Sequence, residues 1–372
     1  MSISSGFVAA GFEPVREAFE RNFEEGRETG ASFAAYLDDE LVVDLIGGWT
    51  DRKQEQPWTA ETLCPVFSTT KPIAALVIAL LVDRGQVDYD EWLSAYWPEF
   101  GAKGKDRITV AEALSHQAGV PGFPDPIDPD LWLDPPALSA ALANLAPMWK
   151  PGEGSGYHPL TWGYIAGELA RRVDGRTLGT ILREDICAPL GIDFWIGTPA
   201  SEHGRCAQMI KPKEPTKFGP PSPALTAAFL TPWAAPARGG PAWREAEIPS
   251  ANGHGDAAAV ARLFCAYAQR GRIGETRLLS EESWAGLTRE RVAGADRILP
   301  GKIAFGAGVM RNLPLIYGQN PETLCHSGWG GSGALGDPSA GLAAAYVMNR
   351  QGSHLLEDAR RSRIIDALYG CL

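Results

Sequence analysis

The 372-residue chain has few cysteines, and none of them lies close to another in the sequence. A disulfide framework or a zinc site normally uses closely spaced cysteine pairs such as C-x-x-C. We therefore expect reduced, mostly buried thiols, no structural metal and no other cofactor. The six isolated positions are Cys64, Cys187, Cys206, Cys265, Cys325 and Cys371.

The chain also lacks runs of basic residues and long apolar runs. Its formal net charge of -11 argues against a nucleic-acid groove or an anionic membrane surface as a partner. The first residues lack the basic start and apolar core of a secretory signal, and no run is long enough for a membrane span. We expect a cytoplasmic protein without membrane insertion. Hydrophobic residues make up 45% of the sequence, enough for one large domain or two closely joined ones.

Apolar periodicity predicts strands at both ends of the chain and helices between them. An opening helix at 13–28 precedes β-rich runs at 31–37 and 40–48, and strands at 323–327 and 341–350 precede a closing helix at 354–370. Six segments between them have helical period and Ala/Leu content: 73–87, 109–117, 138–146, 161–173, 178–190 and 256–270. The predicted fold class is α+β, a mostly antiparallel sheet from both termini flanked by helices, with an inserted mostly helical region.

This layout predicts an α/β domain from residues 1–75 and 256–372, a helical domain from residues 76–255, and an active site in the cleft between them. Two stretches, 121–136 and 212–241, contain six and eight prolines and no clear period. Loops of this length either shape a binding site or serve as surface connections. The sequence leaves both interpretations open.

Residues 66–81, VFSTTKPIAALVIALL, place Ser68 and Lys71 three residues apart at the start of a strongly apolar helix. Residues i and i+3 share a helix face, so the hydroxyl and the amine are within reach of each other. The helix start stabilises an anion, and burial lowers the pKa of a lysine toward that of a usable base. The pattern predicts an activated nucleophile; the alternative is a helix-capping Ser68 with a solvated Lys71. Pro72 requires an irregular helix start or a lost hydrogen bond in the first turn.

The stretch HSGWGGSGALGDP, residues 326–338, is open to three interpretations. Gly328, Gly330 and Gly333 have the G-x-G-x-x-G spacing of a dinucleotide loop, but nothing downstream supplies a βαβ unit. The second interpretation is an esterase elbow of the G-x-S-x-G type, and the third is a wall of an active site whose nucleophile lies elsewhere.

The elbow interpretation makes Ser332 the nucleophile. Its acid and base would come from Asp337, Asp358 and His354. Only 40 residues, 333–372, follow this serine, too few for the rest of a doubly wound sheet, and Ala334 replaces the last glycine of the elbow. The third interpretation is therefore favoured.

Three motifs in order resemble those of the serine β-lactamase and penicillin-binding protein superfamily. They are Ser68-Thr69-Thr70-Lys71, Tyr157-His158-Pro159 and His326-Ser327-Gly328. The stretches at 114–120, 250–256 and 337–350 add to the likeness, which covers roughly residues 15 to 350. The chain is most similar to the class C-related carboxylesterases called family VIII, whose S-x-T-K-P motif accounts for Pro72. The resemblance implies the fold described above.

The resemblance also implies roles for individual residues. Ser68 is the nucleophile, Lys71 its base partner, and Tyr157 a second base whose phenolate the lysine ammonium would favour. The backbone N–H groups of Ser68 and Trp329 form the oxyanion hole, and the bulk of Trp329 narrows the acyl pocket. The expected substrate-binding residues are His158, His326, Ser327, Gly328 and Trp329.

Two departures from the family pattern bear on specificity. Pro159 stands where the lactamases have the asparagine of Y-x-N, and His326 stands where they have the lysine of K-T-G. A histidine is mostly neutral near pH 7, so a fixed cation for a β-lactam carboxylate is missing. We expect a carboxylesterase acting on small esters through an acyl-Ser68 intermediate, with weak or no β-lactamase activity. An acyltransferase, a D-amino acid peptidase or β-lactamase, and a catalytically inactive binding protein remain alternatives.

Overall fold

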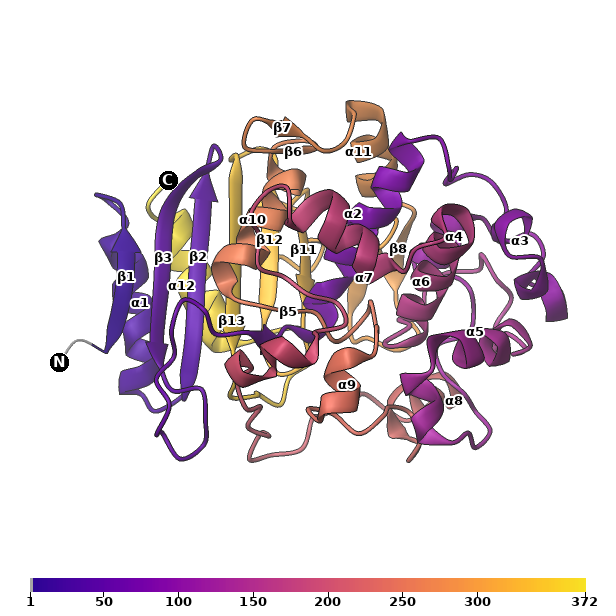
Figure 1. Ribbon diagram of the computed structural model, residues 1–372, viewed down its shortest axis with the longest axis horizontal. Coiled ribbons are helices and arrows are strands. Elements are labelled where there is room, and N and C mark those ends of the chain that lie inside the picture. Colours follow the sequence, from indigo (N-terminus) through magenta and orange to yellow (C-terminus); the bar gives the residue numbers. More distant parts are fainter. Residues whose placement is uncertain (1–2) are drawn as a thin grey trace.

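A nine-stranded antiparallel sheet organises the computed structural model, which describes residues 3–372. The strand order is β1-β3-β2-β13-β12-β11-β10-β9-β8, so strands from the two ends of the chain meet where β2 pairs with β13 (Figure 1). The strands are β1 Ser4–Val8, β2 Gly30–Leu37, β3 Glu40–Gly48, β8 Val292–Ala295, β9 Lys302–Phe305, β10 Met310–Arg311, β11 Leu324–Ser327, β12 Gly333–Asp337 and β13 Leu342–Met348.

Helices cover both faces of this sheet (Figure 1). Helix α10, Ala257–Ala268, packs on β2, β12 and β13, while α1, Glu13–Glu24, packs on β3 and on α12, Ala359–Tyr369. Every residue of β13 is buried, because the strand has neighbours on both faces and both edges. This double burial explains the uninterrupted apolar run of its sequence.

The remaining helices lie mostly in the region between the terminal strands. They are α2 Thr70–Asp83, α3 Leu93–Tyr96, α4 Val110–Leu114, α5 Pro135–Ala143, α6 Thr161–Asp174, α7 Leu178–Ile181, α8 Pro223–Leu225, α9 Pro241–Glu245 and α11 Glu281–Thr288. Short 3-10 segments cover Phe67–Thr69, Pro98–Gly104, Pro129–Leu133 and Ala200–Arg205, and π-helical turns cover Leu182–Cys187 and Thr226–Leu230.

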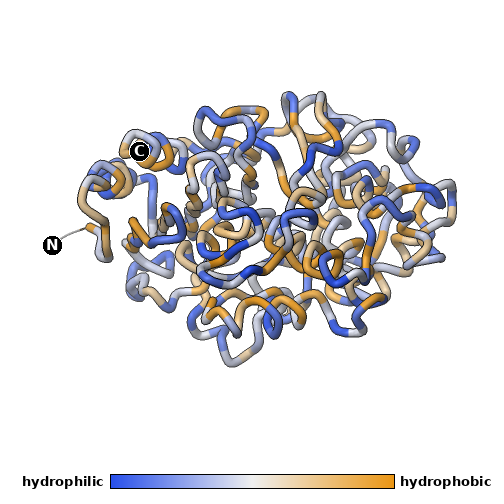
Figure 2. Tube along the Cα trace, turned by 90° about the horizontal axis from the view of Figure 1, so that it is seen from above, coloured by the Kyte–Doolittle hydropathy of each residue, from blue (hydrophilic) through white to orange (hydrophobic). Residues whose placement is uncertain are grey.

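Helix α2 is the central helix of the molecule. Twelve of its 14 residues, 70–81, are buried, and its sequence is hydrophobic all round, as expected for a helix enclosed on every side. It packs on α6, α7 and α11. Figure 2 shows hydrophobic segments running through the middle of the molecule, with hydrophilic segments mostly in the outer turns.

The predicted α+β architecture is confirmed, including the sheet built from both termini. The expected strands at 31–37, 40–48, 323–327 and 341–350 correspond to β2, β3, β11 and β13. Periodicity missed β1, β8, β9, β10 and β12, because they are two to five residues long or rich in glycine. The closing helix begins later than expected, at Ala359, where the Asp358 side chain caps it. The expected limits of the two domains stay a prediction.

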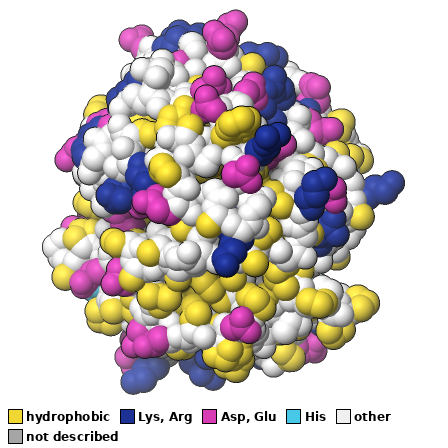
Figure 3. All heavy atoms as spheres, turned by 90° about the vertical axis from the view of Figure 1, so that its right-hand side faces the viewer, with side chains coloured by type: hydrophobic (Ala, Val, Ile, Leu, Met, Phe, Trp, Pro, Cys, Tyr) yellow, Lys and Arg dark blue, Asp and Glu magenta, His cyan; other side chains and the backbone are white. Residues whose placement is uncertain are grey.

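Two small ladders complete the strands. Residues Cys64–Pro65 (β4) pair with His254–Gly255 (β5), and Arg272–Ile273 (β6) pair with Thr276–Arg277 (β7). None of the helices within residues 3–372 is both long and apolar enough to cross a membrane. On the end of the molecule that Figure 3 displays, side chains of both charge signs are interspersed rather than gathered by sign.

Candidate active site

Ser68 lies on an irregular turn between β4 and α2. The turn is a 3-10 segment, Phe67–Thr69, and Ser68 caps neither it nor the helix that follows. Phe67 has a φ of +47°, a left-handed conformation that is unfavourable for a bulky residue and is held by its burial. Pro72 is the third residue of α2, where its missing N–H would have no intrahelical acceptor anyway. The helix therefore begins irregularly, which resolves the question that Pro72 raised.

Lys71 is fully buried beside the serine. Its Nζ lies 3.3 Å from Ser68 Oγ and donates hydrogen bonds to the backbone carbonyls of Pro159, at 2.8 Å, and Ser250, at 3.0 Å. Burial lowers the pKa of Lys71 well below its ordinary value of 10.5, because an ammonium is poorly stabilised away from water. The alternative of a solvated first-turn lysine is excluded by this burial.

The geometry around Lys71 fixes where its lone pair points. A neutral amine has two N–H donors and one lone pair. The two backbone carbonyls take both donors, so the lone pair is left for the third neighbour, the hydroxyl of Ser68. A neutral Lys71 is therefore placed to accept the proton of the serine.

Tyr157 is the third member of this group. Its ring centroid lies 4.7 Å from Lys71 Nζ, and its hydroxyl hydrogen-bonds with Ser68. Burial nevertheless raises the pKa of the phenol, and this effect outweighs the hydrogen bond from Ser68. The resemblance implied a phenolate held by an ammonium; the burial of both groups instead favours a neutral phenol beside a neutral amine.

The half-buried carboxylate of Asp296 fixes the loop that carries Tyr157 through a network of hydrogen bonds. Asp296 accepts hydrogen bonds from the backbone N–H of Tyr157, at 3.0 Å, and from the hydroxyl of Ser155, at 2.7 Å. It also accepts from the N–H groups of Ile298 and Leu299 at its own end. Sequence reasoning did not identify Asp296, since it lies 139 residues from the tyrosine that it positions.

The stretch 326–338 forms the β11–β12 hairpin and one wall of the site. At its turn, Gly330 and Gly331 have φ values of +88° and +127°, which a residue with a side chain rarely adopts. A Cβ on Gly328 would lie well inside 3.0 Å of Ser332 Oγ and the Val66 carbonyl oxygen, so the hairpin approaches the turn that carries Ser68 more closely than a side chain permits. This geometry agrees with the third interpretation of the stretch, in which it forms a wall of a site and does not itself carry the nucleophile.

The oxyanion-hole donors expected from the resemblance are free. The backbone N–H groups of Ser68 and Trp329 donate to no acceptor within residues 3–372. His326 and Ser327 pair only with β12, since β10 pairs with Leu324 and Cys325 and then ends. Strand β11 thus lies between β10 and β12, but its last two residues, His326 and Ser327, have no strand partner on the β10 side.

His326 is buried and uncharged. Burial lowers its pKa to about 3, because an imidazolium is poorly stabilised away from water. Its Nδ1 lies 2.9 Å from the Ser327 carbonyl oxygen, and its Nε2 has no hydrogen-bond partner in the described part of the chain. The expectation of a missing fixed cation at this position agrees with this geometry.

Two of the expected substrate ligands are engaged in holding the protein together. His158 accepts a hydrogen bond from Val120 N–H at its Nε2, at 3.0 Å, and its Nδ1 lies 2.6 Å from the Gly156 carbonyl oxygen. The hydroxyl of Ser327 donates to the Leu356 carbonyl oxygen, at 2.7 Å, and lies 2.9 Å from the Tyr317 hydroxyl. Both ring nitrogens of His158 and the hydroxyl hydrogen of Ser327 are therefore already engaged within the protein.

The residues of the elbow interpretation do not converge. Ser332 is fully buried and donates to the Val66 carbonyl oxygen at 2.8 Å. Asp358 pairs with Arg360, and Asp337 accepts from Asn320 and Tyr369, while His354 is exposed. Within residues 3–372 Ser332 therefore has no acid-base partner, and its hydroxyl instead ties the hairpin to Val66.

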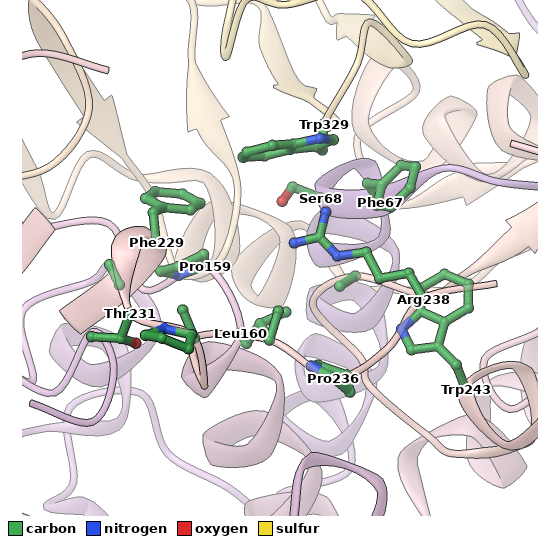
Figure 4. Close-up of a pocket in the computed structure, with 15 residues that line it drawn as sticks. Phe67, Ser68, Pro159, Leu160, Phe229, Thr231, Pro236, Arg238, Trp243 and Trp329 are labelled. Atoms are coloured by element: carbon green, nitrogen blue, oxygen red, sulfur yellow. The ribbon is translucent and has the colours of Figure 1, made fainter. Parts of the chain in front are cut away.

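A cavity of about 260 Å³ opens beside Ser68 (Figure 4). Its walls are mostly apolar and include Phe67, Leu160, Phe229, Trp243 and Trp329. A larger pocket of about 730 Å³ adjoins it and shares Phe67, Arg238, Trp243 and Trp329 with it. Lys71 and Tyr157 lie behind the serine and line neither space.

The proline-rich stretch 212–241 contributes to both spaces, which decides between its two interpretations. Phe229, Pro236 and Arg238 line the smaller cavity, and Pro212 and Glu214 line the larger one. The sequence could not predict which residues of this stretch line the two spaces, because an aperiodic segment has no pattern that shows which side chains point inward.

Comparisons with known proteins relate the whole chain to one family. The sequence profile of the family described as Beta-lactamase matches residues 15–369. Esterase/beta-lactamase LipL of Mycobacterium tuberculosis is 36% identical over 363 residues, which cover 93% of this chain and 82% of that protein. A penicillin-binding protein homolog from Caulobacter crescentus is 51% identical, with a TM-score of 0.97 over 99% of this chain and 100% of that one. A family VIII carboxylesterase is 40% identical, with a TM-score of 0.92 and the same coverage.

Proposed function

Because the chain belongs to the beta-lactamase family, as its three motifs predicted, we propose that it is a serine carboxylesterase that cleaves esters with small acyl groups. The observation that carries the proposal is the buried Lys71, whose two N–H donors are committed to carbonyls and whose lone pair faces Ser68 Oγ at 3.3 Å. The esterases among its relatives support an ester as the substrate.

In the proposed mechanism the ester carbonyl oxygen points to the backbone N–H groups of Ser68 and Trp329, which stabilise the negative charge of the tetrahedral intermediate. Lys71 accepts the proton of Ser68 as its hydroxyl attacks the carbonyl carbon. The Tyr157 hydroxyl donates its proton to the departing alkoxide and regains one from Lys71. Water then attacks the acyl-enzyme by the same proton path, which releases the acid and restores Ser68.

This assignment gives Tyr157 a different role from the phenolate base expected at first. A phenol with a raised pKa is a poor base but a suitable donor to a strongly basic alkoxide. Lys71, with its lowered pKa, is the base.

The cavity beside Ser68 sets the proposed size limit. The bulk of Trp329 and Phe229 on the walls of this cavity of about 260 Å³ supports a preference for short acyl chains over long ones. In a panel of para-nitrophenyl esters, kcat/KM is expected to be greatest for acetyl to butyryl groups and lower for decanoyl.

The Ser68→Ala variant tests the proposal. It should abolish enzymatic hydrolysis of para-nitrophenyl butyrate while thermal unfolding shows an intact fold. Near-full activity in this variant would refute the mechanism at its centre. Product partition with added alcohol measures the acyltransferase alternative, and an assay with D-alanyl peptides measures the peptidase alternative.

Weak or absent β-lactam turnover is also proposed. The neutral, buried His326 offers no cation to a β-lactam carboxylate at this position. Efficient hydrolysis of a penicillin would contradict this point and leave the esterase proposal standing.

A further inference from the structure

The cleft beside Ser68 carries positive charge in an acidic protein. The chain has a net charge of -11, yet Arg238 is the one charged side chain among the described residues that line the smaller cavity. The adjoining pocket adds Lys211 and Arg244 against a single acid, Glu214. A charge of one sign inside a cleft with apolar walls attracts a ligand of the opposite sign.

Arg238 has no counter-charge of its own. Within residues 3–372 its guanidinium has no carboxylate at ion-pair distance and no hydrogen-bond acceptor, whereas the buried Arg360 contacts both Glu28 and Asp358. It lies 5.1 Å from the centroid of the Trp329 ring. A guanidinium presents five donors in a planar fork that matches a carboxylate. In Arg238, whose side chain is exposed, no acceptor of the described chain occupies this fork.

The position of Arg238 places the unused fork at the reaction site. The side chain extends from its loop toward Ser68, beneath the Trp329 ring (Figure 4). It borders the smaller cavity, which Ser68 also lines, and the larger pocket, so a substrate that extends from Ser68 into either space passes it.

We infer that Arg238 determines specificity by pairing with a carboxylate on the ester substrate, so that the enzyme prefers anionic esters to neutral ones. The inference rests on the proposed esterase function. It also limits what the missing K-T-G lysine implies, which is the absence of a cation at position 326 alone. The cation has not been lost from the cleft: it stands on the proline-rich loop, while His326 is neutral.

Two other roles for Arg238 make different predictions. If the side chain only packed on Trp329, a methionine of similar length would replace it without loss of selectivity. If it stabilised the oxyanion, its removal would slow neutral and anionic esters equally. The ratio of kcat/KM for two matched esters separates these roles from carboxylate recognition.

Two ester pairs locate the carboxylate. On the acyl side, para-nitrophenyl hydrogen glutarate is compared with the analogue in which a methyl ketone replaces the carboxylate. On the alcohol side, the butyrate ester of para-hydroxybenzoate is compared with that of para-hydroxyacetophenone. Rates with Ser68→Ala are subtracted, since a glutarate half-ester also hydrolyses without enzyme.

The wild-type enzyme is expected to prefer the anionic member of at least one pair by about 10- to 100-fold, the range of a charge-assisted hydrogen bond. Arg238→Met should reduce that ratio to near one, and Arg238→Lys should keep part of it. High salt should weaken the preference. Arg107→Gln is the matched control, because Arg107 also stacks on a tryptophan, Trp92 at 5.9 Å, but lies outside both cavities.

An unchanged ratio in Arg238→Met, or a wild-type preference for neutral esters in both pairs, would overturn the inference. So would an equal loss on both members of each pair. These outcomes leave the esterase proposal intact, provided that hydrolysis of the neutral esters depends on Ser68. Absence of Ser68-dependent hydrolysis of every ester would instead refute the proposed function.

Discussion

Replacing Gly328 by alanine should impair the oxyanion hole without touching any reacting side chain. The new Cβ would lie well inside 3.0 Å of the Ser332 hydroxyl and of the Val66 carbonyl oxygen. The serine hydroxyl could rotate away, but a backbone carbonyl cannot. The hairpin must therefore move away from the turn that carries Ser68, and the N–H of Trp329 moves with it.

The size of the effect follows from this geometry. Relief of the overlap requires a displacement of about 1 Å, which in an active site costs on the order of 100-fold in rate. Removal of one oxyanion donor costs about 100- to 1,000-fold in kcat, or about 2.7–4 kcal/mol of transition-state stabilisation. We expect Gly328→Ala to lower kcat by about 100-fold or more. KM should change little, because the ground-state carbonyl depends less on this donor.

The assay is steady-state hydrolysis of para-nitrophenyl butyrate, with the melting temperature measured in parallel. Gly204→Ala is the matched control. Gly204 is exposed, lies in a helical turn, and has no atom within 4 Å of its would-be Cβ, so this variant should keep wild-type kcat.

A Gly328→Ala enzyme with kcat within threefold of wild type would refute the placement of the hole. A rise in KM alone would refute it as well, since the loss would then lie in substrate binding. If the variant did not fold, the smaller perturbation Ser332→Gly, which loosens the same hairpin, would take its place with the same expected direction in kcat.

Three further predictions follow from the buried groups. Lys71→Arg should lower kcat by at least about 1,000-fold at every pH, because a guanidinium stays protonated; in the wild type, kcat/KM should fall as pH decreases through the lowered pKa of Lys71. A fluorophosphonate should label Ser68 and not Ser332, as mapped by mass spectrometry, and Ser332→Ala should still be labelled. Stability should decrease as pH falls from 7 to 5: four buried histidines with lowered pKa values take up protons only on unfolding, at about 1.4 kcal/mol per pH unit for each proton. Burial also raises the pKa of Glu28 to about 7, that of Asp256 to about 6, and those of Asp44 and Glu247, and these carboxyls oppose the trend; a melting temperature that rises over this range would contradict it.

The sequence predicted the architecture because the elements that define it are long and periodic. Strands β2, β3 and β13 have seven to nine residues, and α2 and α6 have 14 each. Short strands such as β10, with two residues, carry no period, and only their neighbours in the sheet specify them. The same reason applies to the hairpin β11–β12. Its glycines indicated that the backbone approaches the site closely, but they did not show which strands pair.

The candidate site could be anticipated only where its chemistry lies in local motifs. Ser68 and Lys71 are neighbours on one turn, and the structure brings Tyr157 to them. The carbonyls that orient the lysine come from Pro159 and Ser250, 88 and 179 residues away. The unexpected neutrality of the lysine–tyrosine pair likewise depends on burial, which is a property of the assembled core.

The position of Arg238 in the cleft could not be predicted from the sequence for a further reason. Its loop is held by hydrogen bonds between the two proline-rich stretches: Trp132 donates to the Trp233 carbonyl oxygen, and Trp233 donates to that of Phe123, at 2.8 and 2.9 Å. These are tertiary contacts between aperiodic segments, and no pattern in either segment announces them.

The two carbonyls at Lys71 have a consequence for the newly made protein. Before the segments that carry Pro159 and Ser250 dock, Lys71 is a hydrated lysine with an ordinary pKa, and the serine has no base. A partly folded chain is then unable to acylate itself or to attack stray esters. Catalytic competence therefore requires these two long-range contacts, and during refolding Ser68-dependent hydrolysis should appear only after both segments have docked.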